Sequence, residues 1–270
     1  MSERSPSLEK TAVSGRRPGF GSAMRAEWIK LTSVRSTWWS LFAMVVLGAG
    51  LTTVVCAFNA EWLASAEADE SPGSFITWGM MVAQLTAVVL GALAVTTEYG
   101  TGMIRSTFAA VPSRGRVLAA KAVVLMAVLF VAGTVTALLG YVGGNYFLDR
   151  EGVGLALEGD VARSMYGSGL FMAGLGLFSA AVAFLVRHTA AAISLVLALV
   201  FVVGNMTMLI PGSAGEWITK LMPGNAGSVI ATPVAFNPTL LDAWPGFGVF
   251  VAQAGVLVLI AWALLRSRDA

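Results

Sequence analysis

The sequence predicts an all-α, polytopic membrane protein with six transmembrane helices, an N-terminal interfacial amphipathic helix, and re-entrant or interfacial half-helices between the last two spans. Composition is the first observation: 57% of the 270 residues are hydrophobic and 12% are charged, whereas soluble domains contain about 45–50% and about 25%. The second is length, because the apolar runs reach the ~20 residues that a helix needs to cross a bilayer. The third is that the segments between these runs alternate between basic and acidic.

The chain is expected to start with a tail and continue as one membrane domain. Residues 1–22 are rich in Ser, Pro, Gly and Arg and cannot bury enough apolar area to fold alone, which predicts a disordered cytoplasmic tail. Residues 23–270 are expected to form a single six-span domain, because six spans leave too little chain for a second folded body.

An amphipathic helix is expected just before the first span. Apolar residues recur there at helical spacing: Met24, Trp28, Leu31 and Val34. Charged residues occupy the other faces: Arg25, Glu27, Lys30 and Arg35. This pattern predicts a helix lying in the membrane interface, with Trp28, Lys30, Leu31 and Arg35 as its candidate contact residues.

The six expected spans follow from the apolar runs. They cover residues 37–58, 75–97, 117–141, 165–186, 189–210 and 246–265. Only Arg187 and His188 separate the fourth span from the fifth, which predicts a tight antiparallel hairpin. Small residues within the spans predict close helix packing: Gly133, Gly140, Gly144, Gly174, Gly176 and Ala180.

The loop between the last two spans, residues 211–245, is weakly charged and unusually apolar. Its apolar pieces, residues 217–222 and 226–236, are too short to cross a bilayer, and the loop is divided by Pro211, Pro223, Pro233 and Pro238. Pieces of this length suit re-entrant or interfacial half-helices.

The charge distribution predicts the orientation. The N-terminus, the second and fourth loops with their helix ends, and the C-terminus hold 14 of the 17 Lys and Arg residues. The first, third and fifth loops hold 10 of the 15 acidic residues. Because positive charge is retained in the cytoplasm during insertion, both termini are expected there, as in a multi-pass protein of the bacterial inner membrane.

No pattern in the chain predicts an enzyme. One His and one Cys cannot build a zinc site of the usual kinds, and no Gly-rich loop is followed by Lys-Ser or Lys-Thr, so a P-loop for ATP is absent. Cys56 lies within an apolar run, where a small apolar filler is its expected role. The net charge of +2 follows from orientation and predicts no nucleic-acid partner.

Three segments resemble the permease subunits of bacterial ABC exporters of the second type. Residues 26–39, AEWIKLTSVRSTWW, look like the interfacial helix that leads into their first span. Residues 98–107, EYGTGMIRST, with the following Pro112-Ser113-Arg114 and Ala120-Lys121, are similar to their first cytoplasmic loop. Residues 221–227, LMPGNAG, resemble the outer segment before their last span.

The resemblance implies a permease subunit that pairs with a second permease subunit, as a homodimer or heterodimer, and with separately encoded ABC ATP-binding subunits. ATP and Mg would bind in those partner chains, so this chain would need no cofactor. The second loop would be the coupling element that contacts the ATPase, through Glu98, Tyr99, Met103, Ile104, Arg105 and Phe108. Its apolar side chains could bury against the partner while Glu98 and Arg105 set the register by ion pairs.

The basic residues around the second loop also have a simpler interpretation. Arg105, Arg114, Arg116 and Lys121 could serve only to hold this loop in the cytoplasm.

The sequence is also compatible with two functions besides ATP-driven export. The chain could be a membrane anchor or assembly subunit that moves no cargo, or a secondary carrier. A carrier would place ionisable groups at mid-membrane, and no such set is visible. Uncharged polar residues within the spans could line a cargo path or only pair helices: Gln84, Thr86, Thr134, Thr136, Asn205, Thr207 and Gln253.

Overall fold

The computed structural model describes residues 19–103, 113–235 and 237–267. Every regular element in these ranges is a helix. Six helical stretches are long and apolar enough to cross a membrane, which confirms the all-α polytopic class. Most of the tail expected over residues 1–22 lies outside the described residues.

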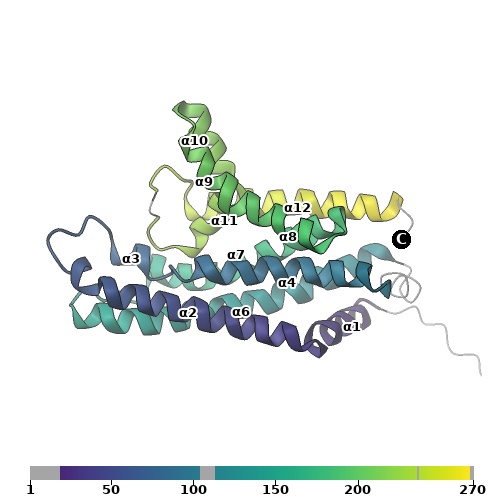
Figure 1. Cartoon of the computed structure of the whole chain (residues 1–270), viewed down its shortest axis with the longest axis horizontal. Coiled ribbons are helices and arrows are strands. Elements are labelled where there is room, and N and C mark those ends of the chain that lie inside the picture. Colours follow the sequence, from purple (N-terminus) through teal and green to yellow (C-terminus); the bar gives the residue numbers. More distant parts are fainter. Residues whose placement is uncertain (1–18, 104–112, 236, 268–270) are drawn as a thin grey trace, which may run out of the picture.

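The helices largely follow the predicted order (Figure 1). In chain order they are α1 (Phe20–Ser33), α2 (Arg35–Leu63), α3 (Pro72–Phe75), α4 (Met80–Gly100), α6 (Arg114–Arg150), α7 (Gly159–Val186), α8 (Thr189–Leu197), the π-helix η1 (Ala198–Val203), α9 (Gly204–Met206), the 3₁₀-helix η2 (Thr207–Leu209), α10 (Gly212–Leu221), α11 (Pro223–Ser228), the 3₁₀-helix η3 (Val229–Ala231) and α12 (Ala243–Ser267).

Three spans differ in detail from the sequence-based boundaries. The second begins with the short helix α3, where the Ser71 hydroxyl accepts a hydrogen bond from the Gly73 amide and Pro72 takes the first helical position. The third, α6, has 37 residues and is about 55 Å long, so it extends beyond a ~30 Å hydrocarbon core. The fifth is not one regular helix, because α8 passes into the π-helical turns of η1 before α9 and η2.

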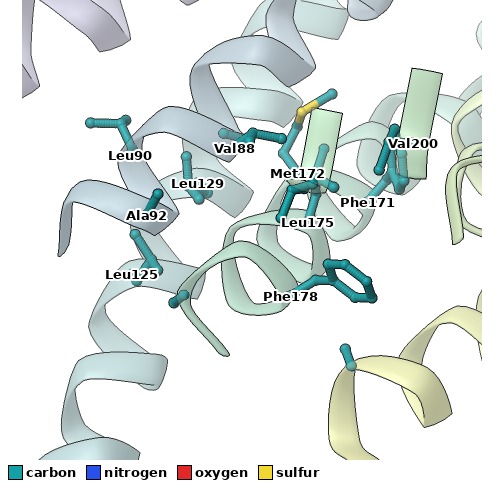
Figure 2. Packing of buried hydrophobic residues seen from close by; sticks show 14 of the residues in the cluster. Val88, Leu90, Ala92, Leu125, Leu129, Phe171, Met172, Leu175, Phe178 and Val200 are labelled. Carbon is teal, nitrogen blue, oxygen red and sulfur yellow. The ribbon is translucent and has the colours of Figure 1, made fainter. Parts of the chain in front are cut away.

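Helix α7 forms the centre of the bundle and is the most buried of the six candidate spans. It packs against α4, α6, α8 and α12. Its inward side chains, Phe171, Met172, Leu175 and Phe178, form the core with residues of α4 and α6 (Figure 2). The aromatic part of the core continues into α12, where the rings of Phe178 and Phe250 stack with centroids 6.0 Å apart.

Small residues permit this close packing, as the sequence predicted. A Cβ atom on Gly91 of α4 would collide with the backbone carbonyl of Gly176 of α7. A Cβ on Gly133 of α6 would lie 3.0 Å from the Cα of Gly169 of α7. Glycine at these positions therefore lets two backbones approach at van der Waals distance.

The tight hairpin between the fourth and fifth spans is also present. Helix α7 ends at Val186, and the next residue, Arg187, adopts a left-handed conformation with φ 58°. His188 precedes α8, and its Nδ1 atom accepts a hydrogen bond from the Ala191 amide at 3.4 Å. Two residues thus reverse the chain and cap the next helix.

The apolar loop before the last span contains the short helices that its composition predicts. Helix α11 and η3 pack against α7 and α12, and Ala226, Val229 and Ile230 are buried there. Helix α10 instead projects from the side of the bundle (Figure 1) and exposes Trp217 and Ile218. The loop therefore has one part built into the bundle and one part outside it.

Candidate functional site

Three helices meet at the end of the bundle where the predicted coupling loop leaves it. Helix α1 packs against α6, and the last turn of α4 approaches both. The described part of the chain stops at residue 103 and resumes at residue 113, so α4 and α6 are the two helices that flank the second loop. The polar residues at this junction are the strongest candidate for a functional site.

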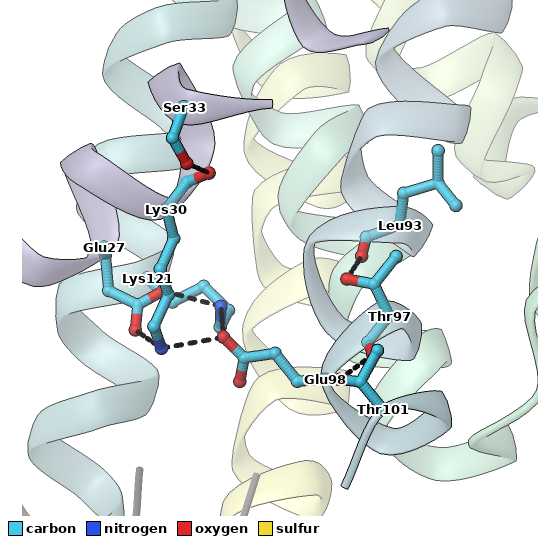
Figure 3. A network of polar contacts seen from close by, with 8 residues as sticks. All are labelled: Glu27, Lys30, Ser33, Leu93, Thr97, Glu98, Thr101 and Lys121. Carbon is cyan, nitrogen blue, oxygen red and sulfur yellow. Dashed lines mark hydrogen bonds and ion pairs between the residues drawn. The ribbon is translucent and has the colours of Figure 1, made fainter. Parts of the chain in front are cut away.

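Four charged side chains form a closed ring at this junction, which we call the charge ring: Glu27 and Lys30 of α1, Glu98 of α4 and Lys121 of α6 (Figure 3). Lys30 Nζ lies 2.7 Å from Glu27 Oε1 and 2.8 Å from Glu98 Oε1. Lys121 Nζ lies 2.6 Å from Glu27 Oε2 and 2.9 Å from Glu98 Oε1. Each lysine therefore bridges both carboxylates, and the ring has no net charge.

The ring is buried rather than exposed to solvent. Glu98 is 2% exposed, Glu27 5% and Lys121 6%; only the side chain of Lys30, at 27%, reaches the surface. Charges removed from water in this way are stable only when they are paired and hydrogen-bonded. Loss of one partner leaves an uncompensated charge, which typically costs about 3–5 kcal/mol.

The ring joins segments that are distant in the sequence. Glu98 lies 68 residues after Lys30, and Lys121 lies 94 residues after Glu27. Two threonines beside it bond to backbone carbonyls of the same stretch of chain: Thr97 Oγ1 donates to the Leu93 carbonyl at 2.7 Å, and Thr101 Oγ1 donates to the Thr97 carbonyl at 2.8 Å (Figure 3). Glu98 is thus the residue of this turn that ties α4 to α1 and α6.

The ring keeps Lys30 charged over the physiological range. Burial alone would lower the pKa of Lys30, but hydrogen bonds and electrostatic attraction from Glu27 and Glu98 outweigh it, so the pKa is raised. The stabilisation from this lysine is complete below the ordinary Lys pKa of about 10.4. It is lost only as the pH rises through the higher pKa of the folded state.

A cavity of about 140 Å³ adjoins the ring, and Thr37, Thr97 and Met103 are among its other lining residues. Glu98 also lines this cavity, and its Oε2 atom makes no hydrogen bond to any of the described residues. The junction therefore contains both a network of short ion pairs and a cavity, next to the start of the second loop.

The six residues predicted to contact an ATPase fall into three groups. Glu98 is buried in the charge ring, and Tyr99 turns inward, with its ring beneath the Arg187 guanidinium at 5.0 Å and edge-on to Phe184. Met103 is 39% exposed. The remaining three lie outside the described residues: Ile104, Arg105 and Phe108. Their role, like the whole partner contact, stays a prediction.

Helix α1 is present, and its position relative to a membrane interface stays a prediction. Trp28 of α1 is 50% exposed, and Arg35, at the start of α2, is exposed as well. The residues that α1 buries are Ala23 and Glu27. Glu27 can turn inward because Lys121 neutralises its carboxylate, an interaction that periodicity alone does not reveal. Leu31 packs partly buried against the core.

The arginine at the start of α6 makes a contact with the last helix. The Arg114 guanidinium donates a hydrogen bond to the Leu265 carbonyl near the end of α12. Nearby, the Arg266 guanidinium lies 3.8 Å from the centre of the Trp262 ring. The hydrogen bond from Arg114 therefore joins the start of α6 to the end of α12.

Sequence patterns alone did not reveal the charge ring. One signal was visible: Lys121 falls inside an apolar run, between Ala120 and Ala122, seven residues after the helix begins at Arg114. A lysine at such a position needs a buried acidic partner. Which acidic residues meet Lys121 is not visible in the sequence, because the contacts with Glu98 and Glu27 depend on how three helices pack.

Within the ranges that the structure describes, no group of three or more His, Cys, Asp or Glu side chains could hold a metal ion. Comparison with protein-family models gives no match for this chain, and no curated protein matches it. A proposal about function must therefore come from the geometry of the bundle and from residues 26–39, 98–107 and 221–227.

Proposed function

We propose that this chain is the transmembrane permease subunit of an ATP-driven ABC exporter in a bacterial inner membrane. A separate ATP-binding subunit would hydrolyse ATP, and this chain would carry the resulting movement into the membrane. A second permease subunit would complete the pathway. Both termini and the second loop would then face the cytoplasm, as the distribution of Lys and Arg favours.

The charge ring is the observation that supports this function most directly. It joins α1 to the two helices that flank the second loop, through four ion pairs of 2.6–2.9 Å. A partner that displaces the loop would therefore move α1, α4 and α6 together. Rigid elements linked by such networks are the physical means by which a local displacement reaches a distant site.

The ring also divides the proposed coupling residues by role. Glu98 would be a positioning residue, because its carboxylate is already engaged by Lys30 and Lys121. The partner surface would consist of Met103 together with Ile104, Arg105 and Phe108. Exposed Trp28 and Ile29 of α1 lie at the same end and could extend this surface.

The test is to replace an exposed residue of this surface without touching the ring. Met103→Asp should leave the protein inserted and folded, because Met103 is 39% exposed. Partner binding and stimulated ATPase activity should be lost, since an unpaired charge buried at an interface costs on the order of several kcal/mol. Co-purification with the partner ATP-binding subunit, followed by ATPase assays in lipid, measures both.

Two control variants make the result specific. Met103→Leu preserves the apolar contact and should behave as the wild type. Ala190→Asp adds the same charge at an exposed position of α8, next to the α7–α8 hairpin, and should also leave binding intact. Wild-type association and stimulation in Met103→Asp would contradict the coupling role. Binding of the ATPase without any stimulation, in the wild type, would favour a membrane anchor instead.

A further inference from the structure

A second cavity, which we call the outer pocket, lies at the opposite end of α4 from the charge ring. It encloses about 340 Å³, within the roughly 300–1,000 Å³ typical of ligand sites. Residues of α3, of the start of α4, of α7 and of the α11–η3 segment form its walls. Met80 and Glu98 are 18 residues apart on one helix, so about 27 Å separates the two sites.

The walls of the outer pocket combine apolar and uncharged polar side chains. None of its lining residues is acidic, basic or a histidine. Trp78, Met81 and Phe171 supply most of the apolar bulk, and Trp78 and Met81 are 39% and 57% exposed. An ion would lose its hydration here without gaining a partner, so the pocket disfavours charged groups. A neutral apolar chain fits the walls and can approach past Trp78 and Met81.

Two wall residues have polar groups that the protein leaves unused. Ser74 and Thr77 are 1% and 4% exposed, and neither hydroxyl makes a hydrogen bond within the described chain. Buried hydroxyls almost always have a partner, because an unmade hydrogen bond is unfavourable. Rotation about the Cα–Cβ bond redirects such a hydroxyl between staggered positions, so a ligand in the pocket can recruit it.

One wall of the pocket is held in place from outside. The Arg163 Nη2 atom donates a hydrogen bond to the Thr232 carbonyl at 2.9 Å and contacts the Pro233 carbonyl at 3.4 Å. Thr232 and the neighbouring Ser228 both line the pocket. These hydrogen bonds fix the α11–η3 segment against α7, so this wall of the pocket is held in place by the fold.

We propose that the outer pocket binds the alkyl chain of an uncharged amphipathic molecule, a long-chain alcohol or ester taken from the bilayer, whose polar group bonds to Ser74 and Thr77. The absence of charge in the walls selects a neutral ligand, and the two unused hydroxyls select one with a hydrogen-bonding end. Binding at this site does not require that the chain transports anything.

The probe is a long-chain primary alcohol with a diazirine near its hydroxyl group, added to the full-length protein in lipid nanodiscs. After illumination, mass spectrometry locates the modified residues. We expect saturable modification within residues 72–84 and 228–232. Unlabelled hexadecanol should compete. Hexadecane should compete at least about fivefold less, the difference expected for one lost hydrogen bond, and hexadecyltrimethylammonium should also compete less, because its charge would be buried without a partner.

Three variants test the assignment. Thr77→Val removes an unpartnered hydroxyl without changing the shape, so folding should be preserved while modification falls about fivefold. Ser228→Phe fills the pocket from its half-buried rim and should reduce modification further. Thr86→Val, in α4 but outside the pocket, is the matched control and should leave modification unchanged.

Two results would overturn the proposal. One is unsaturable modification spread over the lipid-facing residues of α2 and α6, with no effect of Thr77→Val. The other is that a second copy of the chain fills the pocket. In that case Trp78→Cys in a Cys56→Ala background would cross-link between copies in the membrane, and the pocket would remain unmodified by the probe.

Discussion

In the charge ring, each buried charge depends on its neighbours for neutralisation. Glu98 and Lys121 are buried and lie 2.9 Å apart, and both also bond to residues of α1. A buried ion pair is weak evidence for added stability, since its attraction mainly offsets desolvation. The ring is complete only when α1, α4 and α6 pack in this arrangement, because a displaced helix would leave a buried charge unpaired.

This dependence predicts the effect of neutralising one member. Glu98→Gln should lower the free energy of unfolding by about 3–5 kcal/mol, because it leaves Lys30 and Lys121 facing one carboxylate. The double variant with Lys121→Gln restores neutrality and should recover part of the loss. Asp160→Asn removes an exposed carboxylate 3.3 Å from Arg163 and is the control, with a change of at most about 1 kcal/mol.

Thermal unfolding in detergent, followed by tryptophan fluorescence, measures these differences. Equal stability of Glu98→Gln and the wild type would mean that the ring does not hold the junction together.

At the scale of elements, the loop before the last span divides into parts with different surroundings. Helix α11 and η3 are buried against the bundle, whereas α10 exposes Trp217, Ile218 and Leu221. The Lys220 ammonium lies 5.2 Å from the centre of the Trp217 ring. An exposed helix with an aromatic and aliphatic side is typical of segments that lie in the membrane interface.

Helix α10 should therefore place its two sides in different environments. Spin labels on Ile218→Cys and Glu216→Cys, in a Cys56→Ala background, lie about 200° apart around the helix. We expect the label at residue 218 to be accessible to oxygen dissolved in lipid. The label at residue 216 should be accessible to a water-soluble nickel complex. Equal exposure of both labels to the nickel complex in lipid bilayers would show that α10 is outside the membrane interface.

At the scale of the whole molecule, the two candidate sites lie at opposite ends of the bundle. The charge ring joins the helices that flank the second loop, and the outer pocket lies about 27 Å away along α4. Helix α4 contributes to both, and it packs along the central helix α7. A rigid helix of this kind would transmit a displacement at the charge ring to the walls of the outer pocket.

The proposed orientation can be tested by chemical labelling of single cysteines in a Cys56→Ala background. Cysteines replacing Glu67 and Asp160 should react with a membrane-impermeant maleimide in intact cells, because both positions are exposed and lie in the acidic loops. A cysteine replacing the exposed Ser113 should react only after the membrane is permeabilised. Strong external labelling at residue 113 would reverse the topology.

Much of the fold was predictable because insertion into a bilayer depends on the length and hydrophobicity of each segment by itself. A run of ~20 apolar residues is enough to define a span, whatever it packs against. The sequence alone therefore determined the helical class, the six candidate spans, the Arg187–His188 hairpin and the short helices of the apolar loop. It also indicated the glycine contacts, since small residues within spans serve close packing.

Only the tertiary structure decided which polar residues meet. Periodicity predicts an outward face for Glu27, and the charge distribution explains Lys121 by orientation alone, yet the two lie 2.6 Å apart and buried. Ser74 and Thr77 gave no signal at all, because a cavity is formed by several elements and belongs to none of them. Hydropathy and charge counts describe each segment separately, whereas an ion pair or a pocket depends on the packing of segments that are far apart in the chain.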